Sequence, residues 1–236
     1  MPRTTATVTP ATSSTTRAMV APVTVHAIQL TGWDTTRMDF HWVDVFATRP
    51  LSGNPLAVIT AHEFPDADRM QALAAELALS ETVFAVPGDP PRVRIFTPRQ
   101  EIPLAGHPLV GAAWVLRSIG WTGDQAMLRA PGGDIAVQAD DAAARMTARD
   151  PVHAGDADAG PLAHALGAGA AQDTAPVWDA GLPQVMLRVD DLDALAPDHA
   201  EVARLGAEGG WAGASAYALR GERDGRLVAE VRHFAA

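Results

Sequence analysis

The sequence predicts an α+β fold in which short strands surround a buried helix. Short apolar segments bounded by turn residues recur from Trp42 onward, which is typical of strands. Leu109–Ser118 is apolar on nearly every side, so a helix there must be buried all round. The closing Val231–Ala236 echoes the pattern of Val93–Pro98, which indicates two similar halves.

The regular part of the chain opens with a predicted hairpin. Val43–Phe46 and Leu56–Ile59 have the composition of strands, and Leu51–Pro55 between them has that of a turn. Asp66 is predicted to cap a helix that runs to about Leu79. One face of this helix carries Met70, Leu73, Ala74 and Leu77.

Two further strands and the buried helix complete the first half. Thr82–Val86 follows the first helix, and Arg92–Phe96 alternates polar and apolar residues like a half-buried strand. The helix then begins around Gly106–Pro108, because proline suits the first helical position, where its missing N–H costs nothing. We therefore expect a first lobe over residues 38–120.

The second half, residues 121–236, carries weaker signals of the same kind. Strands are predicted near Ala126–Leu128, Ile135–Gln138, Val185–Val189 and Ala216–Leu219. Asp150–Thr174 is predicted to be linker and loop around a short helix at Pro161–Leu166, and Asp191–Leu195 to be another helical turn. If the halves are repeats, the second lacks a central helix after Val231–Phe234.

Composition excludes several classes of function. A formal charge of −10 without basic runs argues against nucleic-acid and anionic-membrane partners. The absence of cysteine excludes thiol-based racemases, disulfide frameworks and cysteine-ligated metals. The eight histidines form no HExxH motif, so we expect no metal site. Gly167–Gly169 lacks the context of a dinucleotide loop, so we expect no nucleotide cofactor.

Residues 1–37 differ from the rest, being rich in threonine and without sustained periodicity. We expect a disordered leader there. Met19–Leu30 is faintly similar to the apolar part of a signal peptide, but Pro22, Thr24 and His26 interrupt it. We favour an upstream start codon, with Met38 as the natural beginning of the protein.

The chemistry most evident in the sequence belongs to Glu81 and His107. A glutamate in an apolar cleft can hold and release a proton near neutrality, but Glu81 is equally compatible with an exposed strand edge. A histidine at a helix start can relay protons or merely cap and pack. Ser80 either binds a substrate or ends the helix, and Gly106 permits close approach of a ligand to the backbone. For His233 the sequence does not decide between cleft and surface.

Five motifs in order resemble the phenazine biosynthesis PhzF-like family, relatives of diaminopimelate epimerase. They are Val43–Phe46, Gly53–Val58, Leu79–Phe84, Arg94–Pro98 and Leu104–Gly111. The resemblance implies two pseudo-symmetric lobes, each a barrel-like sheet around a central helix, with an active site in the cleft between them. It also implies that Glu81 is the general acid/base and that His107 lies beside it. From their positions we further expect Ser80 and Gly106 to bind the substrate, Gly106 through the amides at the helix start.

The same resemblance implies a cofactor-independent isomerase of a small carboxylate or amino-acid-like metabolite. We expect a cytoplasmic protein that acts as a homodimer or with a complementing C-terminal polypeptide. The chain departs from the family at Ala78, where asparagine is common, and after Phe234, where family members continue into an Asp-Pro and Gly-Ser-Ala motif. A second lobe that is incomplete before its central helix, a split enzyme, a non-catalytic binding subunit and a frameshifted remnant therefore all stay open.

Overall fold

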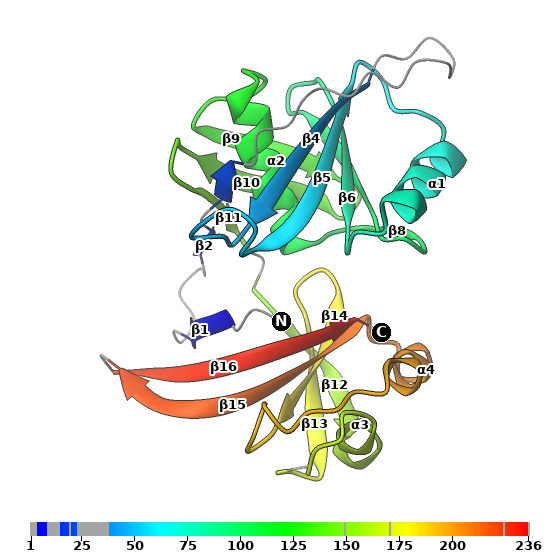
Figure 1. The fold of residues 1–236 in the computed structure, drawn as a ribbon, viewed down its shortest axis with the longest axis vertical. Coiled ribbons are helices and arrows are strands. Elements are labelled where there is room, and N and C mark those ends of the chain that lie inside the picture. The colour runs from blue at the N-terminus through cyan, green and yellow to red at the C-terminus, as the bar shows by residue number, and fades with distance from the viewer. Residues whose placement is uncertain are drawn as a thin grey trace. The chain divides into compact units, whose positions relative to one another are not determined.

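The computed structural model describes residues 4–8, 15–18, 20–22, 38–148, 150–169, 171–223 and 225–235. They form two compact units (Figure 1). The first unit comprises Thr15–Ala148, and the second comprises Arg149–Ala236 together with Met1–Ser14. No helix among the described residues is long and apolar enough to cross a membrane.

The first unit is a ten-stranded mixed sheet with two helices. Its sheet runs in the order β2-β11-β10-β9-β7-β6-β5-β4-β3, with β8 paired to β7. The strands are β2 (Thr15–Ala18), β3 (Val20–Pro22), β4 (Met38–Val45), β5 (Asn54–Ala61), β6 (Thr82–Val86), β7 (Arg92–Phe96), β8 (Glu101–Ile102), β9 (Gln125–Ala130), β10 (Gly133–Ala139) and β11 (Ala144–Thr147). The helices are α1 (Ala67–Leu77) and α2 (Gly106–Ser118).

The sheet of the first unit packs around α2, which contacts β4, β5 and β6 as well as β9, β10 and β11. The prediction of a helix buried on nearly all sides is confirmed, because its residues from Pro108 to Leu116 are buried with the exception of Trp114. The helix begins at Gly106, so Pro108 is its third residue and not its first. Its missing N–H still costs nothing, since the first amides of a helix have no partner inside it.

Gly111 sets the distance between α2 and the sheet. A side chain at this position would overlap Leu56 of β5 and Val45 of β4. The absence of a Cβ therefore lets the helix backbone lie directly against the sheet, which is the usual reason for glycine at a close approach. Four sheet residues on this side, Val43, Leu56, Val83 and Ile95, are at most 2% exposed.

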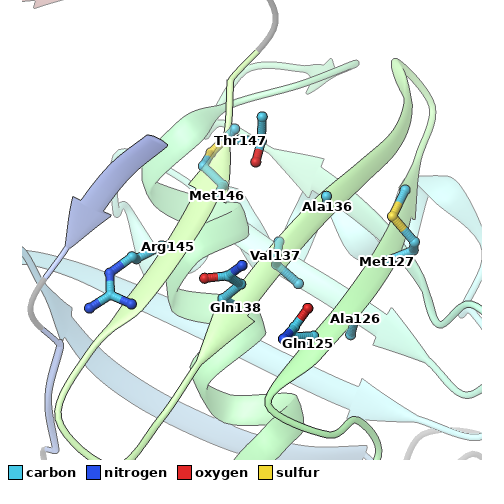
Figure 2. A pocket seen from close by; sticks show the side chains of 9 residues that line it. All are labelled: Gln125, Ala126, Met127, Ala136, Val137, Gln138, Arg145, Met146 and Thr147. Atoms are coloured by element: carbon cyan, nitrogen blue, oxygen red, sulfur yellow. The ribbon is translucent and has the colours of Figure 1, made fainter. Parts of the chain in front are cut away.

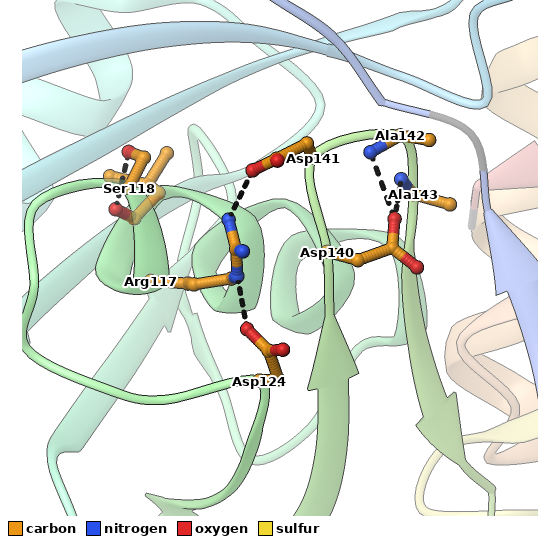
Figure 3. A network of polar contacts seen from close by, with 8 residues as sticks. Arg117, Ser118, Asp124, Asp140, Asp141, Ala142 and Ala143 are labelled. Carbon is orange, nitrogen blue, oxygen red and sulfur yellow. Dashed lines mark hydrogen bonds and ion pairs between the residues drawn. The ribbon is translucent and has the colours of Figure 1, made fainter.

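The far end of α2 is held by an ion-pair network (Figure 3). Arg117 donates from Nε to Asp124 Oδ1 at 2.7 Å and from Nη1 to Asp141 Oδ1 at 2.8 Å. Asp140 accepts from the amides of Ala142 and Ala143 in the turn between β10 and β11. A cation in the last turn also suits the negative end of the helix dipole. These contacts connect the end of α2 to the loops before β9 and after β10.

The other predicted elements of the first unit are confirmed. β4 and β5 form the expected antiparallel hairpin, and β6 and β7 fall on the predicted strands. Asp66 caps α1 by accepting from the Arg69 amide at 2.9 Å. Opposite α2, α1 covers a cluster that contains Met70, Phe84 and Phe96, in which the two phenylalanine rings meet edge to face.

The second unit is a six-stranded sheet with two helices, α3 (Ala159–Ala165) and α4 (His199–Gly209). Its strands, in the order in which they pair, are β1 (Thr4–Val8), β16 (Arg226–Ala235), β15 (Gly213–Arg223), β14 (Pro183–Arg188), β13 (Thr174–Asp179) and β12 (Val152–Asp158). Both helices contribute to one core with the sheet, in which Leu162, Val202 and Phe234 are buried.

The two units share one plan, as the echo between Val93–Pro98 and Val231–Ala236 predicts. In the first unit β4 and β5 are antiparallel, α1 leads to β6 parallel to β5, and β7 returns antiparallel. In the second unit β13, β14, α4, β15 and β16 follow the same directions in the same order. The helices α1 and α4 therefore occupy equivalent places.

The structure differs from the sequence-based expectations in several places. The first unit extends to Ala148 and not to residue 120, because β9, β10 and β11 join the sheet of β4 to β7. The expected linker at Asp150–Thr174 contains β12, whose bulge between His153 and Gly155 hides the alternation of a strand. Asp191–Leu195 is a turn, not a helix. The helix α4 is not anticipated from the sequence.

The leader expected at residues 1–37 lies mostly outside the described residues. Three of its segments are described and form edge strands: β1 pairs with β16, β2 with β11 and β3 with β4. Their threonine, valine and alanine content is compatible with strands, and an exposed sheet edge offers unpaired backbone groups.

Ala78 is a position at which the fold can be stabilised. It ends α1 in the left-handed region, with φ 51°, a conformation that disfavours residues with a Cβ. We predict that Ala78→Gly raises the free energy of unfolding by about 1 kcal/mol in urea denaturation. The matched change Ala72→Gly, at an exposed position inside α1, should lower it by about 1 kcal/mol. An Ala78→Gly protein as unstable as Ala72→Gly would contradict the prediction.

Candidate active site

Glu81 lies between the end of α1 and the start of β6 in the first unit. The left-handed turn at Ala78 ends the helix, and Glu81 comes directly before β6. The parallel pairing of β5 with β6 begins at Ala57 and Thr82, the residue directly after Glu81. The side chain of Glu81 is only 19% exposed, so it is a partly buried carboxyl and not an exposed strand-edge glutamate.

His107 is the second residue of α2, and the fold brings it to Glu81. Its Nε2 lies 3.4 Å from Glu81 Oε2, and its side chain is 11% exposed. The cap residue Ala105 makes no side-chain hydrogen bond to the first turn of the helix. The amides at this end of α2 are therefore not capped by a side chain, and the positive end of the helix dipole lies beside the pair.

Burial shifts the proton affinities of both groups in the direction of the neutral form. Desolvation raises the pKa of Glu81, while a hydrogen bond from Ser80 partly opposes the shift. Desolvation lowers the pKa of His107 from 6.5 to about 4. The imidazole is therefore neutral at pH 7, and the carboxyl binds a proton more readily than an exposed glutamate does.

The facing atoms of the pair lack hydrogen-bond partners. Glu81 Oε2 and His107 Nε2 are both buried and unsatisfied, because their 3.4 Å separation lacks the geometry of a hydrogen bond. An unpaired buried polar atom costs about 1–3 kcal/mol, so the two atoms favour the arrival of a further polar group. A polar or acidic group of a bound molecule would satisfy both.

Ser80 and Gly106 lie next to the pair. The exposed hydroxyl of Ser80 lies 3.3 Å from Asn54 Oδ1 and also within reach of the Glu81 carboxyl, so its single proton is donated to one of the two at a time. Ser80 does not end the helix, since α1 stops at Leu77 with Ala78 as its cap. Gly106 is exposed, and a Cβ there would meet only Met146 Sδ, at an ordinary 3.7 Å. The substrate-binding roles expected for Ser80 and Gly106 stay predictions.

A buried aspartate that the sequence does not reveal supports this region. Asp44, at the end of β4, is 3% exposed and accepts hydrogen bonds from the Ser52 and Gly53 amides at 2.8 and 3.0 Å. A side chain at Gly53 would collide with the Val45 carbonyl and the Asp44 carboxylate. Asp44 thereby fixes the turn that presents Asn54 to Ser80. No local motif links an aspartate to amides eight and nine residues away.

Two hollows in the first unit are lined by neither residue of this pair. One, of about 320 Å³, is formed by β9, β10 and β11 (Figure 2) and is lined by Gln125, Ala126, Met127, Ala136, Val137, Gln138, Arg145, Met146 and Thr147. The other, of about 480 Å³, surrounds Trp114 and Arg117, whose guanidinium already pairs with Asp124 and Asp141. Among the described residues, no three histidine, aspartate or glutamate side chains are grouped closely enough to hold a metal ion.

Comparison with known proteins identifies the family. The family model described as phenazine biosynthesis-like protein matches residues 43–234. The chain belongs to this family. A solved structure of a predicted epimerase from Pseudomonas aeruginosa is 32% identical, with a TM-score of 0.64 over 77% of this chain and 69% of that one. The phenazine biosynthesis-like fold that the resemblance implies is therefore confirmed.

Two curated relatives match a shorter stretch. An uncharacterized isomerase from Mesorhizobium japonicum is 52% identical over 80 residues, which cover 32% of this chain and 26% of the relative. The trans-2,3-dihydro-3-hydroxyanthranilate isomerase of Pseudomonas aeruginosa is 47% identical over 78 residues, 31% of this chain and 28% of that enzyme. Each match thus spans little more than a quarter of the relative's length.

His107 should make the stability of the protein depend on pH. Its pKa is lower in the folded state than the ordinary 6.5, so its contribution is complete above that value and is lost as pH falls toward about 4. The loss should be about 3 kcal/mol. We predict that His107→Asn removes this slope from urea denaturation series between pH 7 and pH 4. His62→Asn, at an exposed position, should leave the pH dependence of the free energy of unfolding as it is in the unmodified protein. The prediction would be contradicted if His107→Asn left that pH dependence unchanged.

Asp44 should be important for stability. Removing its carboxylate leaves the amides of Ser52 and Gly53 without their acceptor, and hydrogen bonds to a charged group contribute about 1.5–3 kcal/mol. We predict that Asp44→Ala lowers the free energy of unfolding by about 3 kcal/mol, measured by urea denaturation. Glu63→Ala, at an exposed loop position, should change it by less than about 0.5 kcal/mol. Equal stability of the two variants would refute the role of Asp44.

Proposed function

We propose that the protein is a cofactor-independent isomerase that moves a proton between carbon atoms of a small carboxylate metabolite. The observation that carries this proposal is the buried pair of Glu81 and His107, with unsatisfied atoms 3.4 Å apart and a raised carboxyl pKa. Proton transfer from carbon needs a base whose pKa lies close to the working pH. Desolvation raises the pKa of Glu81 and so brings it closer to a neutral working pH.

In the proposed reaction Glu81 acts as both base and acid. Its carboxylate removes a proton from one carbon, and the electron pair of the broken C–H bond moves into the adjacent unsaturated system of the substrate. The protonated carboxyl then returns a proton to another carbon, which restores the carboxylate. The neutral imidazole of His107 lies beside this path and assists by a hydrogen bond to the carboxyl or to the substrate.

The substrate's carboxylate is proposed to bind at the N-terminus of α2. The amides of Gly106 and His107 belong to the first turn, which has no side-chain cap, and a helix N-terminus favours anions. Gly106 has room around it, so a ligand can approach its backbone closely. The hydroxyl of Ser80, next to Glu81, supplies a further hydrogen bond.

The relatives support the class of reaction. The Pseudomonas aeruginosa enzyme that matches 31% of this chain is an isomerase of an anthranilate derivative, which is itself a carboxylate. The predicted epimerase of known structure covers more of the chain.

An alternative is a split enzyme or non-catalytic subunit, which needs a second polypeptide to complete the site. Among the described residues, the second unit repeats the order of β4 to β7 and shows no counterpart of α2. A second copy of the chain or a complementing polypeptide would then contribute the missing groups. The chain should accordingly be assayed both alone and with a candidate partner.

Deuterium uptake tests the proposal. With trans-2,3-dihydro-3-hydroxyanthranilate as probe in D₂O, we predict incorporation of deuterium at carbon, detected by mass spectrometry. Glu81→Gln should slow it by about 10³-fold, since it removes the general acid/base, whereas Glu76→Gln on the exposed face of α1 should not. Activity only in the presence of a partner would favour the split enzyme. Unchanged incorporation in Glu81→Gln would exclude Glu81 as the base.

A further inference from the structure

Asn54 and Ser80 meet just outside the paired part of β5 and β6. Asn54 is the first residue of β5, and Ser80 lies two residues before β6. The parallel pairing of the two strands begins only at Ala57 and Thr82. Across the gap before it, Ser80 Oγ lies 3.3 Å from Asn54 Oδ1, although the two residues are 26 positions apart in the chain. The fold thus brings a carboxamide to the residue that precedes the proposed catalytic acid.

The backbone holds Asn54 in place from both sides. Asp44 accepts hydrogen bonds from the amides of Ser52 and Gly53, the two residues before Asn54, at 2.8 and 3.0 Å. The residue after Asn54 is Pro55, which confines the backbone before it to an extended conformation. The carboxamide oxygen is therefore presented at one place by a fixed turn.

The Ser80 hydroxyl has two acceptors for its one proton. Burial raises the pKa of Glu81, and a hydrogen bond from Ser80 lowers it again in part, because it favours the charged carboxylate. The same proton can be donated to Asn54 Oδ1 instead. A distance of 3.3 Å is long for a hydrogen bond between two oxygen atoms, so the bond to Asn54 is easily exchanged for the one to Glu81.

The other titratable groups around the site have different roles. His107 faces the carboxyl of Glu81 from α2 at 3.4 Å but makes no hydrogen bond to it. Burial lowers the pKa of His107 to about 4, so its imidazole is neutral at pH 7. Asp44, at the end of β4, is directed to backbone amides. The hydroxyl of Ser80 is therefore the described donor that acts on the charge of Glu81.

We propose that Asn54 is a positioning residue for the proton transfer, which acts through Ser80 by drawing its hydroxyl proton away from the Glu81 carboxyl. When Glu81 is a carboxylate, the hydroxyl donates to it. When Glu81 has taken a proton from the substrate, the hydroxyl turns to Asn54 Oδ1 and keeps its own proton. Neither state leaves the hydroxyl without an acceptor, so Glu81 can serve first as base and then as acid. This role rests on the proposed function, since it belongs to the same reaction.

The proton affinity of Glu81 tests this role directly. The full chain is labelled with ¹³C-glutamate, Glu81→Gln identifies the carboxyl signal of Glu81, and an NMR titration gives its pKa. Asn54→Ala leaves the Ser80 hydroxyl to the carboxylate and should lower the proton affinity of Glu81 about threefold. Ser80→Ala removes the hydroxyl and should raise that affinity about tenfold.

The double variant Asn54→Ala/Ser80→Ala separates this role from a structural one. Because Asn54 acts only through the hydroxyl, the double variant should titrate like Ser80→Ala alone. If Asn54→Ala acted by admitting water to Glu81, the double variant would have a lower pKa than Ser80→Ala, and the proposal would fail. Ser80→Thr keeps the hydroxyl and should titrate like the unmodified protein. Ser52→Ala, whose hydroxyl donates to the Arg49 carbonyl at 2.7 Å, should also leave the titration unchanged.

Asn54→Val is a second variant for the case that Asn54→Ala does not fold, since valine also lacks the acceptor and suits a strand. A Glu81 pKa that is unchanged or raised in these Asn54 variants would overturn the proposal. In the deuterium assay, the acid limb of the pH profile should move to lower pH in Asn54→Ala and to higher pH in Ser80→Ala. If the unmodified protein incorporates no deuterium, the proposed reaction fails, while the NMR titration still decides whether Asn54 controls the Glu81 carboxyl.

Discussion

The close contact between α2 and the sheet of the first unit is the constraint on which the candidate site depends. Because Gly111 has no side chain, the helix lies directly on Leu56 and Val45. His107 stands one turn before this contact, so the depth of the helix in the sheet also sets the distance between the imidazole and Glu81. The same enclosure excludes water from the pair and moves both pKa values toward the neutral forms. The packing of α2 against the sheet therefore sets both the distance between Glu81 and His107 and the direction of their pKa shifts.

Much of the first unit can be predicted from the sequence because its signals are local. The hairpin of β4 and β5, the Asp66 cap and the apolar run of α2 each lie within a few residues, and Glu81 and His107 stand out through their motifs. Asp44 cannot be found in this way, since its partners Ser52 and Gly53 are joined to it by a turn that exists only in the folded chain.

The second unit is harder to predict for physical reasons. The helix α4 contains Gly206 and Gly209, and glycine lowers helix propensity, so its composition does not stand out as helical although its apolar residues are spaced on one face as in α1. The strand β12 is interrupted by a bulge and is exposed or half-buried throughout, which removes the alternation that identifies a strand. The side chains of Gln184 and His233 approach Gly213 because β14, β15 and β16 pair in one register, and no sequence pattern reveals this contact.

The pairing of β1 with β16 has a consequence for how the chain folds during synthesis. The first unit is continuous from Thr15 to Ala148, so all of its strands have left the ribosome before the second unit is complete. The segment Thr4–Val8 is made before the first unit, yet its partner Leu227–Val231 is made after it. The edge of the second sheet therefore closes only after the whole first unit has been synthesised, when Glu81 and His107 can already be in place.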